Sequence, residues 1–279
     1  MIAFPNAKIN LGLGIGDTLP NGYHQIVTAM VPVTWTDVLE CVDAPDGVTR
    51  LVTSGNRVDC PPEKNLVMRA WETFVREVPQ LSPQDIYLRK IIPDGAGLGG
   101  GSADAAFMLR MLNDIAGKPL PDRRLEELAA TLGSDCPMFI ANRPVVATGT
   151  GTHLSPLDID LRQLSNILIV KPGRSVSTRE AYAEVKPSHL TEDELRATLQ
   201  LPVEEWQGRL CNDFEASVGA KLPEIAEIKE SLLQQGALYA AMSGSGSAVF
   251  GIFPTDKMAD THSYISRGWM AHRCAAVGV

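Results

Sequence analysis

The chain has 279 residues, of which 44% are hydrophobic and 21% charged, a globular composition that excludes a disordered chain, a coiled coil or a collagen-like repeat. Its 25 basic and 33 acidic residues give a net charge of −8, so we expect no nucleic-acid partner, although a local basic pocket for phosphate stays open. The five cysteines are dispersed, and the histidines lack the spacing of a metal site. The chain also has no signal-like start and no apolar run of eighteen residues. These features predict a cytoplasmic protein without a membrane partner.

The opening of the chain has the period of a strand. Residues 7–15 alternate between apolar residues and Lys8, Asn10 and two glycines, which predicts a half-buried strand. Glycine within a strand often marks the close approach of a ligand or of another backbone. A turn at 16–23 should follow, and then strands at 26–42 and 48–54, where Val, Thr and Leu are frequent.

The remaining elements predict an α+β fold. Helices are expected at 65–75, at 102–116 with Gly117 as the C-cap, and at 123–132, 191–199 and 223–235. Strands are expected at 85–92, 145–148, 166–171, 237–242 and 248–253. Because these elements form no simple βαβ series, we predict two domains, residues 1–155 and 156–279.

The strongest chemical signal is the segment PDGAGLGGGSADAA at residues 93–106. Its glycines let the backbone curl with unobstructed N–H groups, and the helix that follows adds the positive end of its dipole. The segment therefore predicts a cradle for a di- or triphosphate, although its spacing fits neither a Walker A loop nor a Rossmann fingerprint. The alternative, a flexible loop beside a buried helix, explains the glycine density poorly. The candidate residues are Pro93, Gly95, Gly97, Leu98, Gly99, Gly100, Gly101 and Ser102.

This segment resembles the phosphate loop of the GHMP superfamily, which includes galactokinase, homoserine kinase, mevalonate kinase and phosphomevalonate kinase. PNAKINLGLGI at the start of the chain is similar to the first motif of the superfamily, and AAMSGSGSAVFGIF at 240–253 is similar to the third. The resemblance implies a two-domain α+β kinase fold. Its N-terminal domain, similar to domain 2 of ribosomal protein S5, would bind ATP, and its C-terminal domain would be a ferredoxin-like α/β sandwich.

NGYHQIVTAM, LGSDCPMFI and CNDFE are similar to one family within the superfamily. That resemblance implies transfer of the ATP γ-phosphoryl group to the 2-hydroxyl of a cytidylyl methylerythritol, a step of the non-mevalonate isoprenoid route. Asp135 matches the catalytic aspartate, which would accept the hydroxyl proton, and Lys8 matches the lysine that would keep this aspartate ionised. Without the resemblance, Asp135 would be read as a turn residue and Lys8 as a solvated lysine.

The same resemblance implies contacts with the small-molecule substrate. Tyr23 and His24 match residues that hold the cytosine, the first by stacking and the second at the polar edge of the base. Asn10 would face the erythritol part, and Thr178 and Tyr182 match a further pair of contacts around the cytosine. Alone, the Tyr-His pair would be read as surface decoration and Tyr182 as a core aromatic.

Nucleotide contacts follow in the same way: Asn65 and Lys90 match positions near the adenine. Mg²⁺ would arrive with ATP and be contacted by Ser102 or Asp135, so no metal site of the protein's own is expected. Asn21 and His153 stand where the family often has aspartate and glutamate. We expect a monomer or a weak homodimer.

Two alternatives stay open. A homoserine- or mevalonate-type kinase would share the fold but would lack the cytosine contacts. A metabolite-binding regulator without activity would have lost a catalytic residue, whereas this chain keeps both.

Overall fold

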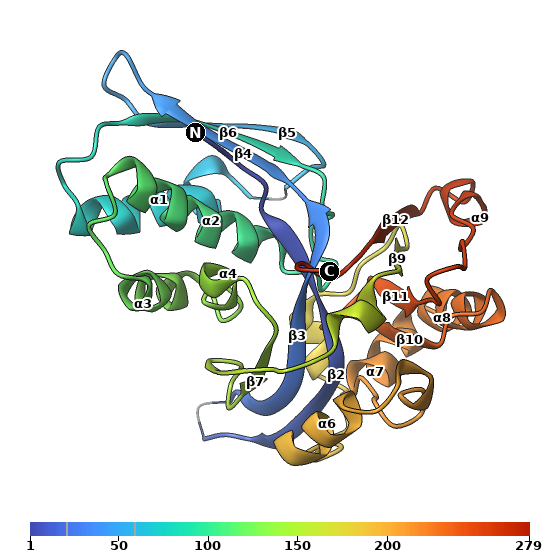
Figure 1. Ribbon diagram of the computed structural model, residues 1–279. Helices are drawn as coiled ribbons and strands as arrows, with labels where there is room; N and C mark the ends of the chain where they lie inside the picture. Colours follow the sequence, from blue (N-terminus) through green and yellow to red (C-terminus); the bar gives the residue numbers. More distant parts are fainter. Residues whose placement is uncertain (21, 59) are drawn as a thin grey trace. The chain divides into compact units, whose positions relative to one another are not determined.

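The computed structural model describes residues 1–20, 22–58 and 60–279, and the chain forms two compact units (Figure 1). Unit 1 consists of Met1–Ala7, Trp35–Asp94 and Gly99–Arg143, and unit 2 of Lys8–Thr34, Gly95–Leu98 and Pro144–Val279. Each unit is thus built from separated segments rather than from one half of the chain. A division into family domains near residue 155 stays a prediction, and Asn21, in the predicted turn, lies outside the described residues.

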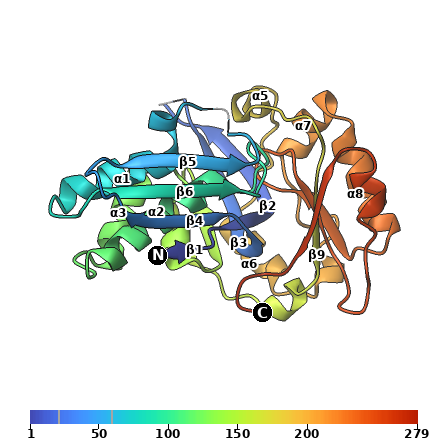
Figure 2. The same ribbon diagram turned by 90° about the horizontal axis from the view of Figure 1, so that it is seen from above.

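Unit 1 is a four-stranded sheet with helices on one face (Figures 1 and 2). The sheet has the order β1-β4-β6-β5, antiparallel except for the parallel pair β5 and β6. The strands are β1 (Ile2–Ala3), β4 (Val38–Asp43), β5 (Arg50–Gly55) and β6 (Gln84–Lys90). The helices are α1 (Leu66–Glu77), α2 (Gly100–Ile115), α3 (Asp122–Leu132) and α4 (Met138–Ala141), with a 3-10 turn η1 (Pro62–Lys64) before α1.

Side-chain periodicity explains how unit 1 forms its core. Along β6 the buried residues alternate with more exposed ones, so that Ile86 and Leu88 face the helices while Tyr87 faces outward. Asn65 caps α1 by accepting a hydrogen bond from the N–H of Val67 at 2.9 Å. The small and apolar residues of α2 are largely buried, which lets this helix pack closely against its neighbours.

Unit 2 contains two four-stranded sheets. The first has the order β2-β3-β7-β8 and the second the antiparallel order β10-β11-β9-β12. Their strands are β2 (Asn6–Thr18), β3 (His24–Thr36), β7 (Val145–Thr148) and β8 (His153–Pro156), then β9 (Ile167–Lys171), β10 (Tyr239–Met242), β11 (Val249–Ile252) and β12 (Met270–Cys274). Helix α8 packs on β10 and β11 of the second sheet (Figure 1).

The remaining elements of unit 2 are short. Its helices are α5 (Thr178–Tyr182), α6 (Glu192–Leu199), α7 (Phe214–Lys221), α8 (Glu224–Gln234) and α9 (His262–Ile265), with 3-10 turns η2 (Leu161–Leu164) and η3 (Val203–Glu205). Across residues 1–20, 22–58 and 60–279, none of the helices combines the length and the apolar character that a bilayer crossing needs.

The single strand predicted at 26–42 is wrong, because the chain breaks it at Asp37 into β3 and β4. The N–H of Asp37 donates to the carbonyl of Pro5 at 2.8 Å. Its carboxylate accepts the N–H groups of Ile91 at 2.5 Å and Ile92 at 2.8 Å. The Val- and Thr-rich sequence shows no break here because the interruption is made by residues distant in the chain.

Candidate active site

The glycine loop leads directly into the N-terminus of α2. Gly97 and Gly99 have φ angles of 74° and 70°, a left-handed conformation that side-chain-bearing residues rarely adopt. Gly99 is the N-cap of α2, and no side chain caps it. The first N–H groups of this 16-residue helix therefore have no side-chain acceptor from the cap, and the helix dipole favours an anion at this end.

The turn that carries Asp135 lies beside the start of α2 within unit 1. Asp135 is half-buried between α3 and α4, and the next residue, Cys136, is fully buried. Burial raises the pKa of the Cys136 thiol to about 11, with the hydrogen bond from Ser102 lowering it and the charge of Asp135 raising it. Cys136 therefore stays a neutral thiol at pH 7 and is not a nucleophile, while its contact with Ser102 places two predicted site segments side by side.

Lys90 is buried, with 4% of its side chain exposed, and its ammonium binds two carboxylates of unit 1. Nζ lies 2.6 Å from Asp104 and also contacts Asp37. Burial alone would lower the pKa of Lys90, but the charges of Asp104 and Asp37 outweigh it and raise that pKa. Burial raises the pKa of Asp104, against the effect of Lys90. The Lys90 ammonium therefore binds two carboxylates of its own unit. The contacts of Lys90 and Asn65 with adenine stay predictions.

Lys90→Met is expected to lower the free energy of unfolding by about 3–5 kcal/mol at pH 7, because two buried carboxylates lose their counter-charge. The loss should be smaller at pH 5 than at pH 8. Burial raises the pKa of Asp104 and the charge of Lys90 lowers it, so removing Lys90 raises this pKa further. A raised pKa in the folded state means that stability falls as pH rises through it, so the variant loses more stability than the wild type as pH increases. Urea unfolding at both pH values measures the change.

Lys118→Met is the matched control, because Lys118 is 74% exposed and its pairing with Asp114 lies at the surface. We expect this control to change stability by less than about 1 kcal/mol. Equal losses in the two variants would contradict the role of the buried charges.

Unit 2 holds the second predicted catalytic residue in a polar network. The ammonium of Lys8 donates to Asn10 Oδ1 at 2.5 Å and to the carbonyl of Gly97 at 3.1 Å. Asn10 Nδ2 donates to Thr28 Oγ1 at 3.0 Å, and the Ser243 hydroxyl donates to the carbonyl of Gly97 at 2.8 Å. All these groups lie in unit 2, so its first strand, the middle of the glycine loop and the third motif meet around one ammonium.

The predicted cytosine contacts are also grouped within unit 2. The rings of His24 and Tyr182 stack with their centroids 5.0 Å apart at 24°, and Tyr182 meets Phe214 edge-on at 4.8 Å. Thr178 Oγ1 lies 3.1 Å from the hydroxyl of Ser245 in the third motif. Tyr23 is 67% exposed. The structure thus brings Thr178, Tyr182 and His24 to one region, and Tyr23 is exposed.

Several residues of these networks were missed by the sequence analysis. Ser243 stands in the third motif and Asp104 in the helix of the glycine segment, so both lay within recognised motifs without an assigned role. Thr28 also stands within a recognised motif, NGYHQIVTAM, whereas Asp37 stands outside all of them. The roles of both residues depend on partners that only the tertiary structure supplies.

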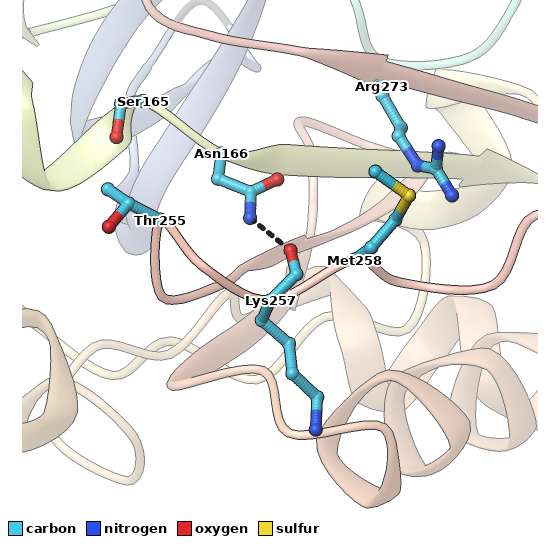
Figure 3. A pocket seen from close by; sticks show the side chains of 6 residues that line it. All are labelled: Ser165, Asn166, Thr255, Lys257, Met258 and Arg273. Atoms are coloured by element: carbon cyan, nitrogen blue, oxygen red, sulfur yellow. Dashed lines mark hydrogen bonds between the residues drawn. The ribbon is translucent and has the colours of Figure 1, made fainter.

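A cavity of about 360 Å³ in unit 2 contains none of the predicted site residues (Figure 3). It is lined by Ser165, Asn166, Thr255, Lys257, Met258 and Arg273. Asn166 Nδ2 donates to the carbonyls of Pro254 and Lys257, both at 2.7 Å, and the ammonium of Lys257 points away from Asn166 (Figure 3). The amide of Asn166 therefore holds the loop that borders the cavity, and we assign the cavity no ligand.

The described part of the chain contains no cluster of three or more His, Cys, Asp or Glu residues suited to a metal ion. Ser102 and Asp135, whose turn contacts Ser102 through Cys136, are oxygen donors of the kind that Mg²⁺ uses when it is carried by a nucleotide.

Family models place the chain in a class of kinases. Residues 65–143 match the GHMP kinases N terminal domain, and residues 196–263 match the GHMP kinases C terminal domain. A mevalonate kinase of Methanococcus jannaschii has the same fold, with a TM-score of 0.73 over 100% of this chain and 98% of its own, at only 13% identity. The fold and the glycine loop are therefore those of a GHMP kinase, and the α+β two-domain kinase architecture expected from the sequence is confirmed.

Full-length relatives make the assignment specific. A 4-diphosphocytidyl-2-C-methyl-D-erythritol kinase of Bacteroides fragilis is 49% identical over 92% of this chain and 94% of its own length. A crystal structure of a 4-(cytidine 5'-diphospho)-2C-methyl-D-erythritol kinase superposes with a TM-score of 0.80, covering 99% of both chains at 29% identity. The chain belongs to the 4-diphosphocytidyl-2-C-methyl-D-erythritol kinase family.

Proposed function

We propose that this protein transfers the γ-phosphoryl group of ATP to the 2-hydroxyl of 4-diphosphocytidyl-2-C-methyl-D-erythritol, within the non-mevalonate route to isoprenoid precursors. The observation that carries the proposal is the 49% identity, over almost the whole of both chains, to a kinase named for this substrate. The uncapped N-terminus of α2 behind the glycine loop supports the nucleotide part of the reaction.

In this mechanism the chain mainly positions groups and stabilises charge, as phosphoryl transfer requires. The loop that begins at Pro93 and ends at Ser102 binds the phosphates of ATP through the backbone N–H groups of the residues that follow Pro93, which has none itself. Asp135 accepts the proton of the attacking hydroxyl, and Lys8 supplies positive charge beside the transferred group. Mg²⁺ bound with the nucleotide would neutralise phosphate charge, with Ser102 and Asp135 as its protein contacts.

Recognition of the cytidylyl group falls to residues of unit 2. Tyr23 stacks on the base, His24 reads its polar edge, and Thr178 and Tyr182 complete the pocket, while Asn10 faces the erythritol part. The stacking of His24 on Tyr182 supports this grouping, since it places two of the named side chains in contact. Asn10 has a second role, because its side chain also accepts a hydrogen bond from Lys8.

Tyr23→Ala is expected to weaken binding of the cytidylyl substrate by about 1–3 kcal/mol, the scale of one lost base–aromatic stack. His24→Ala should abolish discrimination between cytidine and uridine forms, because the two bases differ in donors and acceptors at that edge. The Michaelis constants for ATP and for both forms of the substrate measure these effects. Tyr87→Ala, another exposed tyrosine, is the control and should change neither constant. A loss of ATP affinity with intact substrate affinity would reverse the pocket assignment.

The function itself is tested by offering ATP with a panel of alcohols and measuring the release of ADP. Turnover with the cytidylyl substrate, but not with homoserine or mevalonate, is the expected result. Turnover with either of the other two would favour the homoserine- or mevalonate-type alternative, and no turnover with any alcohol would favour the regulator.

We also propose a cytoplasmic enzyme that acts as a monomer or weak homodimer. Among the residues that the structure describes, the five cysteines are free thiols, which supports a reducing compartment.

A further inference from the structure

The segment CNDFE at residues 211–215 resembles the family, yet none of its residues has a role in the proposed mechanism. In the structure its Asn212 is buried, with 4% exposure. Asn212 Nδ2 donates to the carbonyls of Met242 and Gly244, both at 2.8 Å, and its Oδ1 accepts the N–H of Phe214 at 3.0 Å. The side-chain amide of Asn212 is therefore hydrogen-bonded to the backbone on both sides of Ser243.

Ser243 is fully buried and connects the other two motifs. Its hydroxyl donates to the carbonyl of Gly97 at 2.8 Å and accepts the N–H of Asn10 at 3.3 Å. Gly97 and Asn10 both accept hydrogen bonds from the ammonium of Lys8. The backbone on either side of Ser243 thus helps to set where these two acceptors lie.

The segment that carries Asn212 is itself firmly held. The carboxylate of Asp213 accepts the N–H of Ile15 at 2.7 Å, and the carboxylate of Glu215 accepts the N–H of Met242 at 2.8 Å. Glu215 also pairs with Lys229 at 2.6 Å. These contacts fix Asn212 between β2 and β10, so its amide acts from a rigid support.

We propose that Asn212 is a positioning residue for phosphoryl transfer: by holding the turn at 242–244 it sets Ser243, and through Gly97 and Asn10 it sets the Lys8 ammonium. This inference rests on the proposed role of Lys8 in the kinase reaction. The chemistry specifies asparagine, because both N–H groups of one amide are used on carbonyls. A carboxylate of the same shape offers no donor and would repel both oxygens.

The test compares Asn212→Ala and Asn212→Asp with a matched control, Asn166→Ala. Asn166 is another asparagine of unit 2 whose amide joins two backbone carbonyls, that of Pro254 and that of Lys257, the second of which is drawn in Figure 3. The kcat, both Michaelis constants and the melting temperature are measured for each variant. We expect both Asn212 variants to lose about 10- to 100-fold in kcat, the scale of a misplacement near 1 Å. The Michaelis constants should stay within about threefold, since ground-state binding is kept.

The control should lose melting temperature without losing kcat. If Asn212→Ala does the same, Asn212 is merely structural and the proposal is overturned. Should the Asn212 variants fail to fold, Ser243→Ala carries the test, because it removes only the hydroxyl: a normal kcat in this variant overturns the proposal, and a comparable loss supports it.

The double variant Asn212→Ala with Ser243→Ala adds a second readout. Residues that act through one path are strongly non-additive, so the double variant should lose little more kcat than either single variant. If the loss of kcat in the double variant equals the product of the two single losses, Asn212 and Ser243 act independently. That result would contradict the proposal that Asn212 acts through Ser243. The wild-type protein is assayed first: if it turns over another alcohol, the proposed substrate fails, and the variants are then measured with that alcohol.

Discussion

Replacing Gly97 by alanine is expected to reduce turnover with ATP by about 100-fold or more, because the loop must move by a distance on the ångström scale. A Cβ atom at Gly97 would lie 2.0 Å from the carbonyl oxygen of Ser243, which no packing adjustment of side chains relieves. The φ of 74° adds about 1–2 kcal/mol of strain for any residue with a side chain. The carbonyl of Gly97 accepts a hydrogen bond from the ammonium of Lys8. Displacing Gly97 would therefore also displace the proposed catalytic lysine.

Gly219→Ala provides the matched control, because Gly219 lies in α7, outside the proposed site. A Cβ atom at Gly219 would have no neighbour within 4 Å. We expect this variant to keep its turnover and its affinity for an ATP analogue, measured by calorimetry. Equal losses in the two variants would show that turnover responds to any added methyl group rather than to the close approach at Gly97.

Asp135→Asn is expected to lower kcat by about 10²–10⁴-fold, the usual contribution of a positioned general base. The substitution keeps the shape of the side chain but removes its capacity to accept the hydroxyl proton. Binding of an ATP analogue and the melting temperature should change little, because Asp135 sits in a half-buried turn rather than in the core. Single-turnover kinetics isolates the chemical step from product release.

The control for this variant is Asp114→Asn, the same substitution at an exposed carboxylate of α2 that pairs with Lys118. It should leave every kinetic constant unchanged. Near-normal turnover by Asp135→Asn would remove Asp135 from the role of base and leave the reaction with another proton acceptor.

Local patterns predicted the positions of several regular elements. The alternation at residues 7–15 corresponds to β2, and the glycine segment with its helix corresponds to the start of α2. The prediction that this strand is half-buried is wrong: residues 6–15 are buried on both faces, because Lys8 and Asn10 find polar partners from distant segments. β12 was missed because its residues, from Met270 to Cys274, are mostly half-buried and give no alternation. α7 was missed because its apolar residues do not follow one face of a helix.

The site was predictable only where a motif carried it. Lys8, Asp135 and the loop glycines stand within short motifs, so the sequence could single them out. The roles of Thr28, Asp37 and Asn212 could not be predicted in this way. Thr28 and Asn212 stand within motifs and Asp37 does not, but all three act through partners more than ten residues away. Such roles follow from tertiary contacts between distant segments, which a single sequence does not contain. The stacking of His24 on Tyr182 is of the same kind, since it joins residues 24 and 182.

The interleaving of the two compact units limits how this gene could be recombined. The backbone passes between the units at residues 7/8, 34/35, 94/95, 98/99 and 143/144. A chimera with one junction near residue 155 would therefore build unit 2 from both parents, with Lys8–Thr34 and Gly95–Leu98 from one and most of the segment Pro144–Val279 from the other. Gly95–Leu98 belongs to unit 2 and its flanking residues belong to unit 1. The glycine loop of a chimera would therefore have to fit the packing of both units, even when the units come from different parents. Neither unit can be inherited, exchanged or expressed as one uninterrupted stretch of coding sequence.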